Sequence, residues 1–474
     1  MDDPNSNFKP DESFRDSIAT INEQGKRAWI YALQPKGKLY NLRSYASLIY
    51  LLVLFSLPFI KIDGEPLFLF NVLERRFNIF GYVFWPQDFY LFGLGMITFI
   101  IFIALFTVAF GRIFCGWACP QTIFMELVFR KIEYWIEGDS SKQKQLDKAP
   151  WNQEKIIKKG SKWIVFYLVS FIIANTLLAY VIGVDDLFRI MSEPISKHTG
   201  GFIGIFIFTS IFFFIYLWFR EQVCLVVCPY GRMQGVLLDK DSIVVAYDYV
   251  RGEPRGHIKK NEERAHGDCV DCNLCVKVCP TGIDIRHGTQ LECVNCTACI
   301  DACDTVMDKV GYDRGLIRYA SENGIANKKK LTFTPRLKAY SIVLTILIGV
   351  LGFLLYIRSD VDATITRTPG QLYQSQPNNQ ISNLYNIKLV NKTRKDMPVT
   401  LKVEGVEAEV RMVGKPNIVV KSSSLTEGEF FIILDEKYIT QRKNKLNLSV
   451  YSNGKLIKKL KTNFLGPMGN RNKK

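Results

Sequence analysis

The segment Cys269–Pro280 reads CVDCNLCVKVCP, and the segment Cys293–Cys303 reads CVNCTACIDAC. Both follow the spacing Cys-x2-Cys-x2-Cys-x3-Cys, which is typical of proteins that hold two cubane iron-sulfur clusters. Three closely spaced cysteines let one tight loop present three thiolates to one cube, and the fourth cysteine of each run ligates the cluster of the other run. This spacing therefore predicts a protein that moves single electrons.

The crossed pattern assigns four cysteines to each cluster. Structural zinc is the alternative, but zinc sites pair two Cys-x2-Cys knuckles across a spacer and have no use for a doubled run of eight cysteines. One departure between the runs is that Asp304 follows Cys303, whereas Pro280 follows Cys279. The expected ligands are Cys269, Cys272, Cys275 and Cys303 for the first cluster and Cys279, Cys293, Cys296 and Cys299 for the second.

Five apolar stretches indicate a membrane protein. Of the 474 residues, 48% are hydrophobic, which suits a chain that alternates apolar spans with polar domains. Each stretch has roughly 18 or more residues, long enough as a helix to cross a hydrocarbon core of about 30 Å. Buried helices of a soluble core are the alternative, but residues 211–215 (IFFFI) would be hydrophobic on every face. The predicted spans are Tyr45–Ile62, Phe89–Phe110, Trp163–Val184, Phe202–Phe219 and Ala339–Ile357.

Lysine and arginine residues predict the orientation of the spans. The N-terminal arm and the loop between spans two and three are rich in both and are expected in the cytoplasm. The connections at 63–88, which include the apolar loop Pro66–Phe84, and at 185–201 hold few and are expected outside. The cluster segment is then cytoplasmic, and everything after Ile357 is periplasmic. The net charge of +16 is interpreted as an orientation and lipid-headgroup signal, and nucleic acid is not an expected partner.

Four further cysteines form a matched pair of Cys-x3-Cys-Pro motifs after spans two and four. A spacing of four on a helical turn brings two sulfurs to one face, so two such turns in contact would create a four-thiolate site at the cytoplasmic edge of the membrane. This site could hold a third iron-sulfur cluster, a copper ion or a redox-active dithiol. Packing cysteines are the alternative, but repetition of the motif at equivalent places argues against them. The candidate catalytic residues are Cys115, Cys119, Cys224 and Cys228.

Other polar residues at the membrane carry weaker signals. Asp88 at the outer start of span two and Arg112 at its inner end are explained adequately as helix-end anchors. His198 and Met191 in the second outer connection are a candidate copper contact, although a surface role is the simpler interpretation. The sequence has no glycine-rich nucleotide loop, so flavin and nicotinamide are not required. The electron donor is then another protein or a membrane quinol.

The C-terminal region is predicted to be a β-sandwich. Apolar and polar residues alternate over 385–389, 399–403 and 446–450, and the sequence Ser452-Asn453-Gly454 marks a turn. About 100 residues of short strands fit an immunoglobulin-like fold. The region contains neither Cys nor His, so we expect a docking module rather than a redox site.

The segments FCGWACPQ (Phe114–Gln121) and CLVVCPYGRMQ (Cys224–Gln234), with the doubled cluster motif and a last span that leads to an external domain, resemble the cytochrome c oxidase accessory family CcoG, also called FixG or RdxA. The resemblance covers essentially the whole chain. It implies a protein that reduces Cu(II) to Cu(I) for assembly of the cbb-type oxidase, with copper chaperones or oxidase assembly factors as partners. Related polyferredoxins of the quinol-dehydrogenase kind share these motifs.

The predicted architecture is a membrane α-helical protein with five transmembrane helices, an inserted bacterial-type two-cluster ferredoxin domain and a C-terminal immunoglobulin-like β-sandwich. We expect two 4Fe-4S clusters, and either a copper ion or a third iron-sulfur cluster at the membrane cysteine pairs. A cupric reductase of the bacterial inner membrane is the leading hypothesis; a quinol-linked electron carrier and a non-enzymatic assembly scaffold are the alternatives. The donor is unidentified, and a homodimer is compatible with the sequence. The expected parts are a cytoplasmic arm (1–44), a four-helix transmembrane region (45–220), a cytoplasmic ferredoxin-like domain (221–338), a fifth transmembrane helix (339–357) and a periplasmic immunoglobulin-like domain (358–474).

Overall fold

The computed structural model describes residues 20–21, 24, 26–72, 76–80, 82–257, 266–328, 334–359, 361–370, 372–393, 395–414, 418–422, 424–452 and 454–467. The start of the expected cytoplasmic arm, Asn453 of the predicted turn and residues 468–474 of the expected sandwich domain lie outside this set. The chain forms two compact units, which are described separately. The first comprises Met1–Pro58, Gly95–Ala179 and Gly183–Gly349, and the second Phe59–Leu94, Tyr180–Ile182 and Val350–Lys474.

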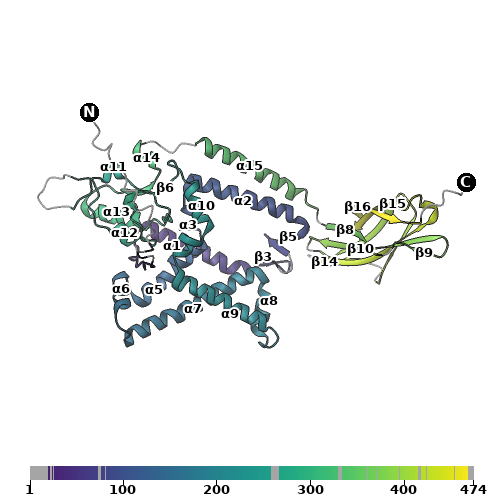
Figure 1. Ribbon diagram of the computed structural model, residues 1–474, viewed down its shortest axis with the longest axis horizontal. Coiled ribbons are helices and arrows are strands. Elements are labelled where there is room, and N and C mark those ends of the chain that lie inside the picture. Colours follow the sequence, from purple (N-terminus) through teal and green to yellow (C-terminus); the bar gives the residue numbers. More distant parts are fainter. Residues whose placement is uncertain are drawn as a thin grey trace. The chain divides into compact units, whose positions relative to one another are not determined.

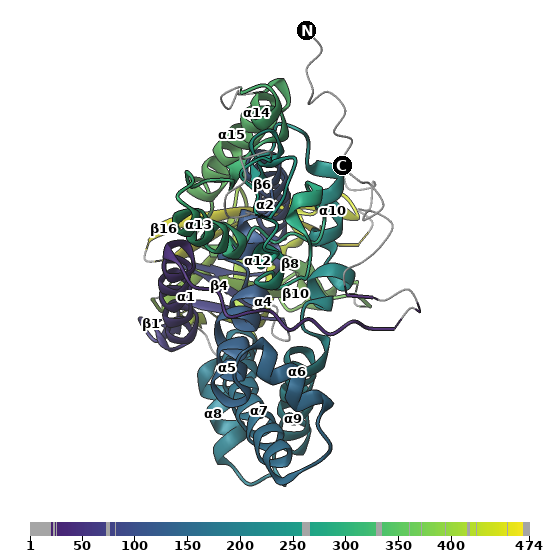
Figure 2. The ribbon, with the colours of Figure 1, turned by 90° about the vertical axis from the view of Figure 1, so that its left-hand side faces the viewer.

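Five helices of the described residues are long and apolar enough to cross a membrane, which confirms the predicted number. Figures 1 and 2 show α7 and α9 side by side, and the ring centroids of Tyr167 and Phe213 lie 5.5 Å apart between them. A π-helical turn extends α9 to Phe219. The five helices are α1 (Lys38–Ser56), α2 (Phe89–Phe110), α7 (Gln153–Ile182), α9 (Thr199–Phe214) and α15 (Pro335–Tyr356).

Shorter helices connect the spans and build the cysteine-rich part. Several are only one or two turns long, because prolines and capping residues stop and restart the chain there. They are α3 (Ile113–Trp117), α4 (Pro120–Thr122), α5 (Arg130–Glu137), α6 (Ser140–Lys148), α8 (Val184–Ser192), α10 (Pro229–Leu237), α11 (Tyr249–Gly252), α12 (Leu274–Lys277), α13 (Ala298–Val310) and α14 (Glu322–Ala326).

The helix α7 begins well before Trp163, where the apolar pattern starts. Asn152 caps it, because its side chain accepts a hydrogen bond of 2.8 Å from a backbone N–H of the first turn. The ammonium groups of Lys159 and Lys162 lie 3.0 and 2.8 Å from the carboxylate of Glu137 on α5. Paired charges therefore let the helix continue beyond the hydrophobic segment that hydropathy alone detects.

The first span begins at a carboxylate from the ferredoxin-like residues 221–338, which we call the ferredoxin part. The backbone N–H groups of Leu39 and Tyr40 donate to the two carboxylate oxygens of Asp301 on α13, at 3.1 and 2.7 Å. A Cβ atom at Gly37 would lie 2.3 Å from the Asp301 carboxyl carbon, so only glycine leaves room for this contact. Because a carboxylate at a helix N-terminus also favours the helix dipole, this contact fixes where α1 starts.

The ferredoxin part packs around a small apolar core. Strands β6 (Val244–Tyr247) and β7 (Ile317–Ala320) pair antiparallel, with Val244 opposite Ala320 and Tyr247 opposite Ile317. Buried Met307 of α13 packs with these strands and with several of the cysteines. The core therefore surrounds the cysteine runs instead of standing apart from them.

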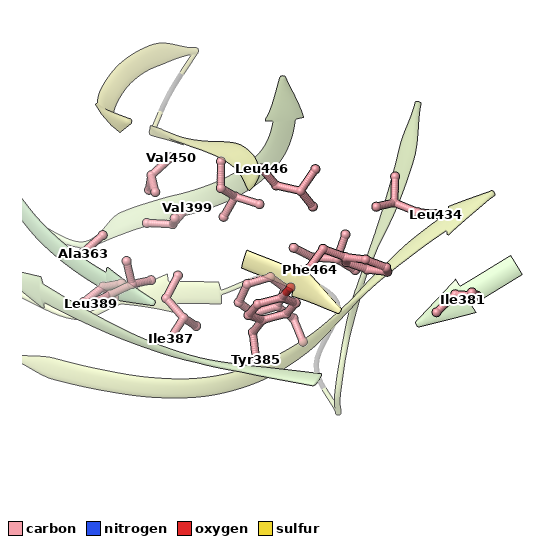
Figure 3. Close-up of a cluster of buried hydrophobic side chains, with 14 of the residues drawn as sticks. Ala363, Ile381, Tyr385, Ile387, Leu389, Val399, Leu434, Leu446, Val450 and Phe464 are labelled. Atoms are coloured by element: carbon pink, nitrogen blue, oxygen red, sulfur yellow. The ribbon is translucent and has the colours of Figure 1, made fainter. Parts of the chain in front are cut away.

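The second unit contains the predicted sandwich of two antiparallel sheets, with the order β12-β14-β10-β8 in one, where β9 also pairs with β10, and β13-β11-β15-β16 in the other. Figure 3 shows Tyr385, Ile387 and Leu389 of β10 facing the interior with Phe464 of β16; all four are 0% exposed. This confirms the alternation read from the sequence. The strands are β8 (Val361–Arg367), β9 (Gln374–Gln376), β10 (Gln380–Asn391), β11 (Met397–Glu404), β12 (Ala408–Met412), β13 (Ile418–Val420), β14 (Leu425–Asp435), β15 (Lys443–Ser452) and β16 (Lys455–Leu465).

The connection between spans one and two was expected to be a loop, but it contains two small antiparallel sheets. The aromatic residues of this stretch pair across strands: the ring centroids of Phe70 and Phe77 lie 6.4 Å apart. Short β-branched and aromatic runs favour strands even where no long alternation exists. The strands are β1 (Lys61–Ile62), β2 (Glu65–Pro66), β3 (Phe68–Asn71), β4 (Arg76–Ile79) and β5 (Tyr82–Phe84).

Asp88 is more than a helix-end anchor, because it lies in a buried group of charges. Its carboxylate is 2.6 Å from the ammonium of Lys392, which follows β10, and 2.7 Å from the guanidinium of Arg358, which follows α15. Lys392 also lies 2.5 Å from Asp362, which Lys458 contacts at 2.8 Å. Asp88 and Lys392 are 2% and 3% exposed. The group therefore attaches the sandwich to the chain segments that adjoin α2 and α15.

Replacing Lys392 with methionine is expected to destabilise the second unit by about 3–5 kcal/mol, because a buried carboxylate loses its partner. The matched control is Lys388→Met on β10, the strand that Lys392 follows; its ion pair with Glu427 is 54% and 58% exposed and should contribute no more than about 1 kcal/mol. Thermal unfolding of the purified full-length variants measures the difference. Equal midpoints for the two variants would contradict a stabilising role for the buried group.

Candidate redox site

The two cysteine runs fold into loops with the same backbone. In each run the residues on both sides of the second cysteine are left-handed: φ is 51° at Asp271, 56° at Asn273, 52° at Asn295 and 67° at Thr297. Asp and Asn adopt this conformation readily, but a β-branched threonine does so rarely and marks a constrained functional loop. Such turns gather backbone N–H groups into concavities that bind anions, including iron-sulfur clusters.

Each loop lines its own cavity. In both cavities three cysteines come from one run and another from the other run, while Cys275 borders both. Apolar side chains such as Val245 and Ile283 in one cavity, and Leu316 in the other, form the remaining walls. The cysteines are Cys279, Cys293, Cys296 and Cys299 around the first of these cavities and Cys269, Cys272 and Cys303, with Cys275, around the second.

These thiols fit a cofactor that carries positive charge. Burial raises the pKa of Cys293 to about 12 and that of Cys296 to about 11, so a free thiol there is neutral at physiological pH. Iron supplies the charge that would stabilise a thiolate. Within the described residues, no three Cys, His, Asp or Glu side chains are grouped so that they could hold a single metal ion.

The two loops differ in exposure. Cys272 is exposed, whereas Cys296 at the equivalent place in the second run is 8% exposed. The difference arises because Cys115 and its neighbours cover the second loop: Cys115 packs in one apolar cluster with Val294 and Cys296. The first loop has an accessible edge, and the second faces the membrane cysteine motifs.

The first Cys-x3-Cys-Pro motif begins on the α-helix α3 and the second on the π-helical turn Val223–Val227, but both end in the same way, and neither is the single helical turn that was expected. The helix breaks at the second cysteine, with ψ of 124° at Cys119 and 114° at Cys228, and the following proline starts a new helix. A residue before proline is driven to extended geometry, and proline suits the first helical position. In both motifs the N–H of the second cysteine donates to the carbonyl five residues earlier, at 2.9 and 2.8 Å.

The four thiols of these motifs are near enough to influence one another electrostatically, although no three of them are grouped to hold a single metal ion in the described structure. The pKa of Cys115 is raised to about 11 and that of Cys224 to about 12, mainly by burial and in smaller part by the neighbouring thiols. Cys119 and Cys228 are among the neighbours that act on both thiols, so the four cysteines lie near one another. The side-chain amide of Gln234 donates to the Cys115 sulfur at 3.7 Å. We call Cys115, Cys119, Cys224 and Cys228 the four-cysteine site.

The first motif lies directly against the second cluster loop. A Cβ atom at Gly116 would lie 2.5 Å from the carbonyl oxygen of Val294 and 2.7 Å from that of Asn295. The indole N–H of Trp117 donates to the Tyr319 hydroxyl at 3.1 Å, and that hydroxyl donates to the Asn295 carbonyl at 3.3 Å. Backbone and side chains thus hold the four-cysteine site in contact with Cys293–Cys299.

Two buried arginines also connect the Cys-x3-Cys-Pro motifs to the second cluster loop. Arg43 of α1, 2% exposed, donates to the Gly116 carbonyl at 2.6 Å and to the Cys296 carbonyl at 3.5 Å. Arg112 donates to the Gly231 carbonyl at 3.1 Å and to the Cys293 carbonyl at 3.5 Å. It therefore connects both motifs to the cluster loop and is more than the helix-end anchor suggested by the sequence.

In the sequence, Arg43 is one of the basic residues of the N-terminal arm, which were used only to predict orientation. The available signal was its place two residues before the predicted first span, because a cation buried at a membrane edge needs several acceptors. Gly116 carried no signal beyond its place between two cysteines. His198, the weaker copper candidate, lies 3.1 Å from the carboxylate of Glu193, and Met191 is exposed.

A buried ion-pair network adjoins the four-cysteine site. Glu133 of α5 contacts Arg220 at 2.9 Å and Lys162 of α7 at 3.2 Å. Arg220 has a φ of 50° and precedes the π-helical turn Val223–Val227 that carries Cys224. The Tyr216 hydroxyl donates to the Gln121 side chain at 3.1 Å beside the first motif. The network fixes the turn that leads into the second motif.

Three curated proteins are similar to this chain over most of its length. RdxA of Cereibacter sphaeroides is 34% identical, with 75% of this chain and 77% of RdxA covered. RdxB of the same bacterium is 34% identical, with 79% and 81% covered. The nitrogen fixation protein FixG of Rhizobium meliloti is 33% identical, with 82% of this chain and 81% of FixG covered.

Three family models match separate parts of the chain. Residues 219–322 match a 4Fe-4S dicluster domain, and they include the two cysteine runs together with Cys224 and Cys228. Residues 92–142 match a 4Fe-4S binding domain, and they include Cys115 and Cys119. Residues 351–467 match the IG-like fold at the C-terminus of FixG. The chain is therefore a membrane protein that carries iron-sulfur centres and has redox activity.

Proposed function

This chain belongs to the FixG/RdxA family of membrane iron-sulfur proteins, and we propose that it reduces Cu(II) to Cu(I) at the four-cysteine site. The observation that carries the proposal is the packing of Cys115 with Cys296, which brings four soft ligands next to a cluster loop. Thiolates prefer cuprous ion, so binding there favours the reduced product.

We assign two 4Fe-4S clusters to the cavities lined by the two cysteine runs. When bound, they supply single-electron transfer, the chemistry that one-electron reduction of Cu(II) requires. Two observations support this assignment: the left-handed residues in each loop, and the burial that raises the pKa of thiols such as that of Cys293. The proposed ligands are Cys269, Cys272, Cys275 and Cys303 for one cluster and Cys279, Cys293, Cys296 and Cys299 for the other.

The difference in exposure supports a direction for electron flow. The accessible edge at Cys272 suits contact with an electron donor, which is another protein or a membrane quinol. The covered second loop suits delivery to copper. Arg43 and Arg112 act as positioning residues, because they bind backbone carbonyls of the cluster loop and of the cysteine motifs at the same time.

A third iron-sulfur cluster is the alternative occupant of the four-cysteine site. It is favoured by the match of residues 92–142 to a 4Fe-4S binding domain, since Cys115 and Cys119 are the cysteines of that segment. In that case copper would be a substrate that meets the site transiently. Iron content distinguishes the two occupants.

We place the protein in the bacterial inner membrane, with its N-terminus and ferredoxin part in the cytoplasm and the sandwich in the periplasm. The lysine and arginine asymmetry of the loops supports this orientation. The sandwich would then be available to copper chaperones or oxidase assembly factors. The test is accessibility of single introduced cysteines to a membrane-impermeant thiol reagent at Asn378 of the sandwich and Lys277 of the ferredoxin part.

Anaerobic stopped-flow reoxidation tests the proposed activity. Dithionite-reduced full-length protein is mixed with Cu(II) in the presence of a Cu(I)-specific chelator, and a soluble quinone serves as the parallel acceptor. We expect rapid bleaching of the cluster absorbance with one Cu(I) formed per electron lost, and little response to quinone. Fast quinone reduction with slow copper reduction would instead support a quinol-linked carrier.

A further inference from the structure

The unit that contains the sandwich has a cavity of about 950 Å³ that the redox chemistry does not use. One part of its wall is apolar and aromatic, with Leu355 and Tyr356 from the last turn of α15 and Phe84 from β5. The other part carries cations and hydroxyl groups. These polar residues are Arg358, Ser359, Lys392 and Thr393.

The cationic wall has a buried donor without an acceptor. Arg358 is 10% exposed, and its Nε atom has no hydrogen-bond partner within the described residues, although its Nη2 atom contacts Asp88 at 2.7 Å. The Arg358 guanidinium also lies 4.6 Å from the Phe84 ring centroid, which holds it at the edge of the aromatic wall. A buried unsatisfied donor is costly, so an anionic oxygen at this position would be favoured.

The residues along α15 and just after it change from apolar to cationic, in the same order as the tail and headgroup of an amphiphile. The helix is long and apolar enough to cross a membrane and ends at Tyr356, and the two residues that line the cavity immediately beyond it are Arg358 and Ser359. Aromatic residues and arginines occupy the same level of a bilayer as lipid headgroups. The apolar wall therefore adjoins the hydrocarbon layer, and the cationic wall adjoins the polar layer.

We propose that this cavity binds a membrane phospholipid, with its phosphodiester at Arg358 and Lys392 and the upper part of one acyl chain along Leu355 and Tyr356. The uncharged ring of a quinone would leave the Arg358 donor without an anion. Free phosphate would satisfy that donor but would gain nothing from the apolar wall. The combination of both walls selects the lipid, and this holds for either orientation of the chain in the membrane.

Native mass spectrometry of the detergent-purified full-length protein tests the proposal with added phosphatidylglycerol. Arg358→Gln removes the charge-assisted contact and should weaken lipid binding roughly tenfold or more. Gly352→Leu tests the apolar wall independently: Gly352 lines the cavity, and a Cβ atom there meets nothing within 4 Å, so the variant should fold while its side chain obstructs the acyl chain. The matched control is Gly349→Leu on the same helix, which also has open space and does not line the cavity.

We expect Arg358→Gln and Gly352→Leu to lose bound lipid while Gly349→Leu retains it. Unchanged lipid binding in Gly352→Leu would overturn the proposal even if Arg358→Gln did not fold. Equal binding of diacylglycerol, which lacks the phosphate, would overturn the role of the cations. Binding of inorganic phosphate as tight as that of the lipid, or displacement of the lipid by a lower concentration of quinone, would also overturn it.

Discussion

A double variant with Cys115→Ser and Cys228→Ser should lose Cu(II) reduction almost completely while both ferredoxin clusters keep their absorbance and their reduction by dithionite. The substitution removes one soft ligand from each Cys-x3-Cys-Pro motif, and hydroxyl groups are poor ligands for cuprous ion. Loss of groups that merely support metal ligands already costs about 10–100-fold. Removal of the ligands themselves should reduce the rate by more than that, as measured by chelator-trapped Cu(I) in single turnover.

Iron analysis of the same variant identifies the occupant of the four-cysteine site. Unchanged iron per chain is expected if copper occupies the site, and loss of one cluster's iron is expected if a third cluster does. Cys272→Ser is the contrasting variant, because it should lower iron content at the exposed loop and leave the four-cysteine site intact. Full copper reduction by the Cys115→Ser, Cys228→Ser chain would show that the cysteine pairs are not the site of reduction.

Gly116→Ala should slow electron delivery to copper on the order of tenfold to a hundredfold, which is the cost of misplacing reacting groups by about 1 Å. The added Cβ atom would lie 2.5 Å from the Val294 carbonyl oxygen, and because that atom is backbone, the cysteine motif must move away from the cluster loop. The measurement is the reoxidation rate after mixing with Cu(II), together with Cu(II) affinity by equilibrium titration.

A substitution that merely destabilises the protein would lower both the reoxidation rate and the Cu(II) affinity. A shift of the cysteine motif away from the cluster loop should lower the rate and leave the affinity unchanged. Gly204→Ala is the matched control, since a Cβ atom on that glycine of α9 meets nothing within 4 Å. Equal rates for Gly116→Ala and the unmodified protein would mean that the close packing of the first cysteine motif against the cluster loop has no part in the transfer.

Much of this architecture could be predicted from sequence because each signal was local. The apolar runs are long, the cysteine spacing is regular, and the alternation at Tyr385, Ile387 and Leu389 is uninterrupted, so each pattern depends on a few adjacent residues. Ends of elements were less predictable. The helix α7 starts before Trp163 because Lys159 and Lys162 in its early turns form ion pairs with Glu137 on α5. A pattern read over a few adjacent residues does not include both members of such a pair.

The details of the four-cysteine site were also beyond local patterns. Spacing alone suggested one helical turn per motif, whereas each proline forces the preceding cysteine out of the helix. The proximity of Cys115 to Cys296 depends on how three separate segments pack. Arg43 and Asp88 looked like ordinary charges near a membrane, because their roles lie in contacts with residues far along the chain.

The cap on the first span has a consequence for biogenesis. The ribosome completes α1 long before it reaches Asp301, which is separated by 262 positions from the Leu39 N–H that it binds. Since domains form in order of synthesis, the membrane anchor must wait, without its final cap, until the iron-sulfur part has folded. Asp301 lies two positions before Cys303, so it takes its place only when the iron-sulfur part folds. If iron is scarce and this part does not fold, the start of the first span would lack its cap and would be open to quality-control proteases.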